Sequence, residues 1–343
     1  MNNTKLFIKR SIKSFAAATK IKAGFPSVAP DSVNIIAYHR VVADIRKAEK
    51  EAIYGLVVSA ATFRRHCETL RKSFDVISLE TARQFLNGER KSERPLAVLT
   101  FDDGYLDFYE EAFPILREFD LTATVFLPTG YIGQNKFLAH DRIYWLVRQA
   151  VEKSVSMKDA LLKAGVTGEF VKEFDDPRRL LRLTDLLVHQ PNELREKVIF
   201  EMERELGDKF EAYPPEYRLL NWEMIREMAR KGIDFGGHTA NHVVLPLETD
   251  TAVKAELIAD KQEIEAHLGI EINSFAYPNG QYNAEIRRIV AQAGYKIAVT
   301  TEKMINRPAA DLLALGRISL CEESTRGFTG VYSPQVAELR LGI

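Results

Sequence analysis

The chain has 343 residues, with 47 Lys or Arg against 48 Asp or Glu, so its formal net charge is −1. This balance disfavours a protein that wraps nucleic acid, because such proteins need a basic surface to release counterions from the phosphates. No apolar run approaches the roughly 20 residues that span a bilayer, and two cysteines, Cys67 and Cys321, are too few for a disulfide framework or a thiolate zinc cluster.

Basic and apolar residues are interleaved in residues 5–22, before the first acid at Asp31. Ile8, Ile12 and Phe15 are spaced so that a helix here would have one apolar and one cationic face. No apolar core of about 7–15 residues follows the charges, so we expect no secretory signal peptide and a cytoplasmic protein. Two interpretations stay open: peripheral contact with the inner membrane face, or an arm that packs on the protein.

Short apolar runs rich in β-branched residues recur along the chain and predict buried strands at 33–38, 96–101, 123–127, 233–237, 274–277 and 297–300, with a last apolar segment at 316–320. Helical spacing lies between them, at 62–73, 79–86, 108–119, 222–231, 252–268 and 284–293. Continuously apolar strands that alternate with helices indicate a parallel α/β architecture.

The alternation is interrupted from about residue 134 to residue 216. Segments rich in Leu and charge have helical spacing here, at 142–152, 157–164, 178–188 and 193–206. Asp176 followed by Pro177 is typical of an N-cap and a first-turn proline. Because strands resume afterwards, we interpret the stretch as a helical insertion in a domain covering residues 31–343, preceded by an arm of residues 1–30.

Two adjacent acids, Asp102 and Asp103, follow the predicted strand that ends at Phe101. Neighbouring side chains of a strand point to opposite faces, so both acids can serve one site only where the strand gives way to a loop. Gly104 permits that turn, and the end of a buried parallel strand is where α/β proteins place ligands. A helix cap is the competing interpretation, as we expect for the second Asp-Asp pair at 175–176.

His238 and His242 lie four residues apart, directly after Gly236 and Gly237 at a predicted strand end. On one helical turn, residues four apart are neighbours, so both imidazoles can bind one metal ion. A single histidine is more often structural, but two at this spacing favour a metal site. With one carboxylate they form a His2Asp set that leaves a position for water, as in catalytic zinc sites.

These motifs resemble those of the polysaccharide deacetylases of the NodB-homology type, carbohydrate esterase family 4. The family's first motif is similar to residues 100–105 (TFDDGY), its second, His-Ser/Thr-x-x-His, to residues 238–242, and its third, usually Arg-x-Pro-Tyr, to residues 276–280 (AYPNG). The similarity covers residues 31–130 and 217–320. It implies a distorted (β/α) barrel of seven or eight strands, and a metal-dependent hydrolase that removes N-acetyl groups from amino sugars of a polysaccharide or glycolipid.

The resemblance also implies roles for single residues. Asp103, His238 and His242 would hold the metal, for which Zn2+ is the best match and Co2+, Ni2+ or Mn2+ are alternatives. Asp102 would be the general base for the attacking water. The backbone N–H of Asn279 would bind the oxyanion.

The general acid departs from the family's usual pattern, in which it is a late histidine, because no histidine follows His267. The early Tyr38-His39-Arg40 resembles a circularly permuted branch of the family, in which an early histidine takes this role. We therefore expect His39 to be the general acid.

The third motif departs in two positions. Ala276 replaces the arginine that orients the base, and we expect Arg317 to supply that charge, with a surface salt bridge as the competing interpretation. Asn279 replaces the tyrosine, so contacts with the substrate differ there. Tyr277 follows a strand and is the aromatic residue that we expect to contact the sugar.

The other histidines carry no functional signal. His66 and His267 fall within predicted helices and His189 at a helix end, so we interpret them as structural. His140 and Asp141 begin the insertion. A position near the cleft, as part of a lid, stays open for them, although no pattern in the sequence shows it.

Two alternatives to the polysaccharide deacetylase stay open. One is a deacylase of a lipid-linked sugar at the inner membrane face, which the basic segment 5–22 motivates. The other is a non-catalytic glycan-binding protein that keeps the fold, although such a protein has no need of Asp102. The expected partner is an N-acetylated glycan or glycolipid, and no nucleic acid.

Overall fold

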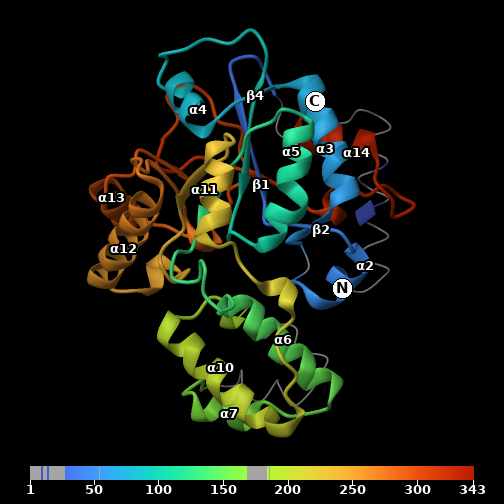
Figure 1. Ribbon diagram of the computed structural model, residues 1–343, viewed down its shortest axis with the longest axis vertical. Helices are drawn as coiled ribbons and strands as arrows, with labels where there is room; N and C mark the ends of the chain where they lie inside the picture. The colour runs from blue at the N-terminus through green and yellow to red at the C-terminus, as the bar shows by residue number, and fades with distance from the viewer. Residues whose placement is uncertain (1–8, 11–13, 15–27, 54, 168–183, 185) are drawn as a thin grey trace.

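A curled parallel sheet forms the centre of the protein (Figure 1). The computed structural model describes residues 9–10, 14, 28–53, 55–167, 184 and 186–343. The sheet has the strand order β10-β1-β5-β6-β7-β8-β9, with β4 also paired to β5, and every pairing is parallel. Its strands are β1 (Val33–Tyr38), β4 (Asp75–Val76), β5 (Leu96–Phe101), β6 (Thr124–Leu127), β7 (Asp234–Gly237), β8 (Ser274–Ala276), β9 (Ile297–Val299) and β10 (Ile318–Ser319). The predicted distorted barrel of seven or eight strands is confirmed.

The burial of the two central strands, β1 and β5, explains why their sequences are continuously apolar. Every residue of β1 and β5 is buried, as expected for parallel strands covered on both faces. They pair in register from Val33 opposite Leu96 to Tyr38 opposite Phe101. The residues that follow the two strands therefore begin at the same edge of the sheet.

Helices cover the sheet, and most begin at the capping residue that the sequence places there. They are α3 (Ala60–Ser73), α4 (Leu79–Leu86), α5 (Phe113–Glu118), α11 (Trp222–Arg230), α12 (Asp250–Leu268), α13 (Ala284–Gln292) and α14 (Pro334–Leu341). A side-chain oxygen accepts a backbone N–H of the first turn at Ser59, Ser78, Asn221, Thr249, Asn283 and Ser333. Each cap satisfies a donor that has no partner within its helix.

Two local features differ from a simple alternation of strands and helices. The predicted helix 108–119 begins as a π-helical turn, Phe108–Ala112, before α5, because Pro114 has no N–H for the bond to Glu110 and its ring clashes there. Next to β1, the short strands β2 (Arg40–Val42) and β3 (Val57–Ser59) pair in parallel and are connected through α2 (Ile45–Glu51).

Three helices between β6 and α11 form a separate group at the bottom of Figure 1: α6 (Ala139–Glu152), α7 (Lys158–Lys163) and α10 (Asn192–Leu206). They correspond to three of the helices predicted in the insertion and enclose their own apolar cluster, which includes Ile143, Leu146, Met157, Leu161, Val198 and Met202. Most of the fourth predicted helix, 178–188, lies outside the described residues, as do Asp176 and Pro177.

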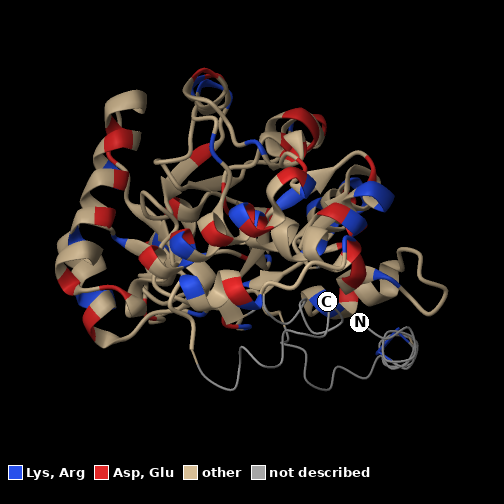
Figure 2. Cartoon of the chain, turned by 90° about the horizontal axis from the view of Figure 1, so that it is seen from below, with Lys and Arg blue, Asp and Glu red and all other residues tan. Residues whose placement is uncertain are grey.

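Charged residues of both signs are interspersed over the described helices (Figure 2). Of the basic segment 5–22, only Lys9, Arg10 and Ser14 are described, so its contact with a membrane stays a prediction. Arg10 pairs with Glu323, with 2.5 Å between Nη2 and Oε2. Among the described residues, no helix combines the length and the apolar character that crossing a membrane requires.

His66 is one of the histidines interpreted as structural, and it is buried in α3. Its Nδ1 lies 3.1 Å from the Tyr38 hydroxyl and its Nε2 lies 3.0 Å from Thr325 Oγ1. Burial lowers the pKa of His66 to about 3, whereas a histidine in an unfolded chain has a pKa of about 6.5. Below about pH 6.5, therefore, the unfolded chain binds a proton at this residue that the folded protein does not.

This difference predicts that His66 makes the protein less stable in acid. The free energy of unfolding should fall as the pH falls from about 6.5, with this residue contributing up to about 1.4 kcal/mol per pH unit. We expect His66→Gln to lose less stability than the wild type between pH 7 and pH 5, as measured by urea unfolding at each pH. Parallel losses in the two proteins would contradict the assignment.

Candidate metal centre

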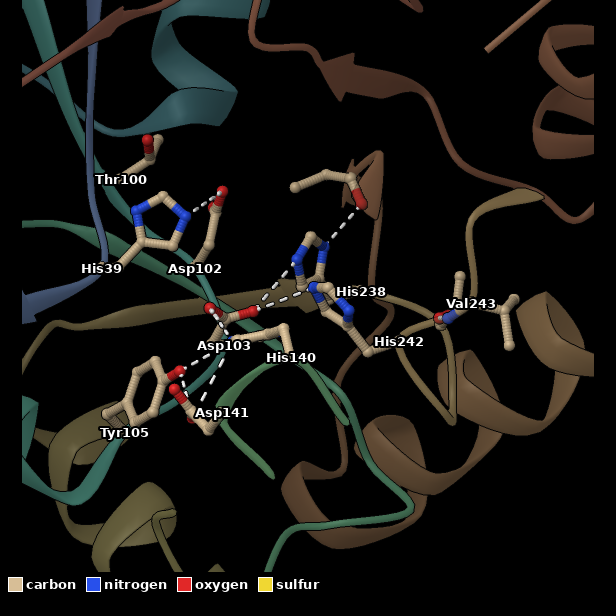
Figure 3. A network of polar contacts seen from close by, with 12 residues as sticks. His39, Thr100, Asp102, Asp103, Tyr105, His140, Asp141, His238, His242 and Val243 are labelled. Carbon is tan, nitrogen blue, oxygen red and sulfur yellow. Dashed lines mark hydrogen bonds and ion pairs between the residues drawn. The ribbon is translucent and has the colours of Figure 1, made fainter. Parts of the chain in front are cut away.

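The candidate site lies where polar residues follow neighbouring strands of the sheet. His39 follows β1, Asp102 and Asp103 follow β5, and His238 follows β7. Parallel strands present their carboxyl ends at one edge, which brings these residues together. The register of β1 with β5 puts His39 beside Asp102, with 3.9 Å from the imidazole Nε2 to Oδ2 (Figure 3).

Left-handed backbone conformations turn the chain at the site. Asp103 has a φ of 74°, which ends the strand sharply and lets both adjacent acids face one region. Thr239 and His242 have φ values of 62° and 49°, so residues 238–242 form a turn, and the helical turn predicted from the histidine spacing is wrong. A left-handed residue cannot continue a right-handed helix. Such conformations cost about 1–3 kcal/mol each and cluster at functional sites.

Three of the predicted residues form a compact, buried set. The potential ligand atoms of Asp103, His238 and His242 all lie within 4.8 Å of one another. Asp103 Oδ1 is 3.1 Å from His242 Nε2 and 3.4 Å from His238 Nε2. Tetrahedral bonds of about 2.0–2.2 Å to zinc place neighbouring ligand atoms roughly 3.3 Å apart. Asp103 Oδ1 is also buried without a hydrogen-bond partner among the described residues, so the set fits a metal ion.

The tautomer of His238 suits a ligand. Its Nδ1 lies 2.7 Å from the Ala276 carbonyl oxygen, and a carbonyl can only accept, so Nδ1 carries the proton. In the neutral imidazole the lone pair is therefore on Nε2, the nitrogen that faces Asp103. A hydrogen bond of this kind from the other ring nitrogen is the usual way in which proteins orient a metal-ligating histidine.

A buried carboxylate from α12 fixes the strand ends beneath the site. Asp260 accepts the backbone N–H of His238 at 2.8 Å and that of Thr129 at 3.2 Å, and thereby joins the ends of β7 and β6. Gly237 leaves space for this carboxylate, because a Cβ there would lie 2.6 Å from Asp260 Oδ2.

Asp102 has a different partner from its neighbour. Arg317 donates to both carboxylate oxygens, Nη1 to Oδ1 and Nη2 to Oδ2, each at 2.7 Å. Arg317 is only 1% exposed, so the competing interpretation of a surface salt bridge is wrong. Although burial by itself raises the pKa of Asp102, the charge and hydrogen bonds of Arg317 hold that pKa below its usual value. Asp102 is thus an ionised carboxylate outside the ligand set.

Asp102 and the three potential ligands line a cavity of about 150 Å3. The residues that form its walls are His39, Ile53, Leu56, Asp102, Asp103, His140, Thr184, Val188, His238, His242, Asn279 and Thr301. Three other hollows are larger, at about 310, 350 and 420 Å3, but none of them contains Asp102 or the three potential ligands. The chemistry of the lining residues, and not the volume, therefore identifies the small cavity as the candidate site.

The two predicted residues of the third motif have different outcomes. Asn279 lines the cavity and has a φ of 55°. Tyr277 does not: it is 0% exposed, its hydroxyl donates to the Leu313 carbonyl oxygen at 2.9 Å, and its ring stacks on Tyr282. The prediction that Tyr277 contacts the sugar is therefore wrong. β8 ends at Ala276, and the next side chain points into the core.

Six of the lining residues were not predicted as site residues, and His140 is the only histidine among them. It comes from α6 and its ring centroid lies 5.1 Å from that of His242. The only available signal was a His-Asp pair at the beginning of the predicted insertion. No fixed spacing relates that pair to the other motifs.

The buried pair of Arg317 and Asp102 predicts a large effect on stability. Arg317→Met leaves a buried carboxylate without its partner, which should lower the free energy of unfolding by about 3–5 kcal/mol. Arg83→Met is a matched control, because Arg83 pairs with Glu80 on the exposed side of α4, and such pairs contribute roughly 0–1 kcal/mol. Urea unfolding measures both, and similar losses would contradict this account of Arg317.

Comparison with known proteins identifies the family. Residues 89–173 and 192–298 match the family model for polysaccharide deacetylases. The poly-β-1,6-N-acetyl-D-glucosamine N-deacetylase of Staphylococcus aureus is 26% identical over 244 residues, which cover 65% of this chain and 77% of that protein.

Two solved structures share the fold. IcaB from Ammonifex degensii has a TM-score of 0.58 at 18% identity and covers 92% of this chain and 100% of its own. The Streptococcus pyogenes deacetylase PplD has a TM-score of 0.57 at 21% identity, and the match covers 89% of this chain and 100% of the PplD chain. Because the residues matched by the family model make up more than half of the chain and include both adjacent acids and both paired histidines, this protein belongs to the polysaccharide deacetylase family.

Proposed function

We propose that the protein is a metal-dependent hydrolase that removes N-acetyl groups from amino sugars of a polysaccharide or glycolipid. The observation that carries this proposal is the buried set of Asp103, His238 and His242 with an ionised Asp102 beside it. The name of the Staphylococcus aureus relative specifies N-deacetylation of a poly-N-acetylglucosamine, which supports the same substrate class here. Two imidazoles and one carboxylate suit Zn2+ best, with Co2+, Ni2+ and Mn2+ as alternatives.

Asp103, His238 and His242 would hold the metal ion, which when bound polarises a carbonyl group and lowers the pKa of water toward about 7. The hydrogen bond from His238 Nδ1 to the Ala276 carbonyl keeps the imidazole in the orientation and tautomer that a ligand needs. All three side chains are buried.

Asp102 is the general base in this proposal. Its two oxygens are held by Arg317, and its lowered pKa keeps it able to accept the proton of the attacking water at neutral pH. Loss of the third-motif arginine at position 276 would favour a non-catalytic binder, but Arg317 supplies a guanidinium to Asp102 in this proposal. A protein that only binds glycans needs neither Asp102 nor its buried partner.

His39 is the general acid in this proposal. It lines the same cavity, its Nε2 lies 3.9 Å from Asp102 Oδ2, and its side chain is 23% exposed, so it can exchange protons with solvent. It would give a proton to the departing amine nitrogen of the sugar. The backbone N–H of Asn279, at the cavity wall, would bind the oxyanion that develops on the acetyl group.

The alternative substrate, a lipid-linked sugar at the inner membrane face, depends on the basic segment 5–22. Because that segment lies almost entirely outside the described residues, no contact of the site favours this alternative over a polysaccharide. It stays a prediction from the sequence, together with the expected cytoplasmic location.

The proposed roles of the two adjacent acids predict that substitution of Asp103 removes the metal and substitution of Asp102 does not. Asp103→Ala, His238→Ala and His242→Ala should each lose bound zinc and acetate release, whereas Asp102→Asn should keep zinc and lose about 10²- to 10⁴-fold in turnover. Elemental analysis measures zinc, and acetate release from N-acetylglucosamine oligomers measures activity. His267→Ala is the control, because that histidine stacks on Trp222 at the surface. Full zinc and activity in His238→Ala would refute the site.

Two substrates with different leaving groups distinguish the role of the proposed general acid, His39, from that of the proposed general base, Asp102. We expect His39→Ala to lower turnover of the N-acetylated sugar by about 10²- to 10⁴-fold. It should hardly affect an activated aryl acetate, whose leaving group departs without a proton. Asp102→Asn should impair both reactions, since each needs an activated water. If His39→Ala slows the two substrates equally, His39 is not the acid.

A further inference from the structure

The helical group of α6, α7 and α10 contributes side chains to the metal centre itself. His140 and Asp141 lie in the first turn of α6 and are 8% and 1% exposed. Both contact Tyr105, the last residue of the 100–105 motif (Figure 3). The first motif and the insertion therefore share one buried polar network.

The hydrogen bonds of this network indicate which ring nitrogen of His140 carries the hydrogen. The Tyr105 hydroxyl donates to Asp141 Oδ2 at 2.7 Å, and a hydroxyl has only one proton to give. His140 Nε2 lies 2.9 Å from the same hydroxyl oxygen. When Asp141 is ionised and accepts the hydroxyl proton, the tautomer of His140 that matches this contact carries its hydrogen on Nε2 and donates it to that oxygen. Tyr105 is fixed in turn by the Arg40 guanidinium, 4.8 Å from the centre of its ring.

The two oxygens of Asp103 consequently have different surroundings. Oδ1 lies 3.1–3.4 Å from the Nε2 atoms of His242 and His238. Oδ2 lies on the other side, 3.9 Å from His140 Nε2. The positive N–H edge of His140 thus faces the oxygen that the two ligating histidines leave free.

The second motif is held from the same group of helices. Arg195 of α10 is 1% exposed and donates from Nη2 to the carbonyl oxygen of His242 at 3.1 Å. The loops that carry Asp103 and His242 therefore each contact the insertion.

We propose that His140 is a positioning residue of the metal centre, anchored through Tyr105 and Asp141, which orients the Asp103 carboxylate so that Oδ1 alone faces the metal. This inference rests on the metal-binding role proposed above for Asp103, His238 and His242. His140 is not itself a ligand, because its Nε2 hydrogen is committed to Tyr105. Loss of a residue that orients a metal ligand typically weakens metal binding by about 10- to 100-fold.

The test measures metal binding by the full-length apoprotein, independently of turnover. Chelator competition gives the zinc affinity, and the visible spectrum of the Co2+-loaded protein reports the coordination geometry. We expect His140→Ala to weaken zinc binding by about 10- to 100-fold and to change the Co2+ spectrum. Tyr105→Phe should act in the same direction, although it keeps the ring against Arg40.

Two further variants separate positioning from a purely structural role. His140→Gln should restore much of the zinc affinity, because a glutamine amide N–H can reach the position of Nε2. His267→Ala, at a residue that does not line the cavity, should match the wild type in affinity and spectrum. If His140→Ala does not fold, Tyr105→Phe and His140→Gln decide the question.

The outcomes distinguish this inference from the proposed function. A wild-type protein that binds neither zinc nor Co2+ would overturn the metal-binding role, and the inference with it. If the wild type binds zinc while His140→Ala and Tyr105→Phe keep its affinity and spectrum, only the role of His140 is overturned. A lower melting temperature with unchanged zinc affinity would overturn it as well.

Discussion

The different surroundings of the adjacent carboxylates Asp102 and Asp103 depend on one backbone angle, the φ of Asp103. Parallel pairing brings the ends of β1, β5 and β7 to one edge of the sheet, but alternation along a strand would send Asp102 and Asp103 to opposite faces. The left-handed conformation of Asp103 breaks that alternation. One carboxylate then meets Arg317 while the next meets two imidazoles. Chemically identical side chains thus acquire different surroundings, which the proposed base and ligand require.

Arg317 pairs with Asp102 although the third motif has Ala276 at the position where the family's motif usually has arginine. Arg317 directly precedes β10, which pairs with β1, and β1 lies beside β5. The guanidinium therefore reaches Asp102 from the segment at β10, two strands from β5, whereas position 276 belongs to β8. The backbone of Ala276 keeps a function of its own, because its carbonyl fixes the tautomer of His238. The substitution at 276 removes a side chain without removing either interaction.

Local patterns predicted most strands and helices, both acids of the cavity and three of its four histidines, because apolar runs, caps and adjacent polar residues are properties of short segments. Tyr277 was misjudged because the direction of a side chain beyond a strand end depends on distant packing, here with Leu313 and Tyr282. The turn at 238–242 was misjudged because a spacing of four does not distinguish a helix from a left-handed turn. His140 was not predicted because its contact with Asp103 joins two segments that are separated by α5 and β6, and no short-range spacing records such a contact.

The buried polar residues of the insertion restrict how its helices can lie against the sheet. Asp141 and Arg195 are each 1% exposed, and burying such groups without partners costs several kcal/mol. Their partners are Tyr105 and the His242 carbonyl, one on each motif loop. An apolar interface could slide, whereas these contacts are satisfied only where both loops meet the helices at once. That same arrangement brings His140 to Asp103, so the geometry of the candidate metal centre and the docking of the insertion are set together.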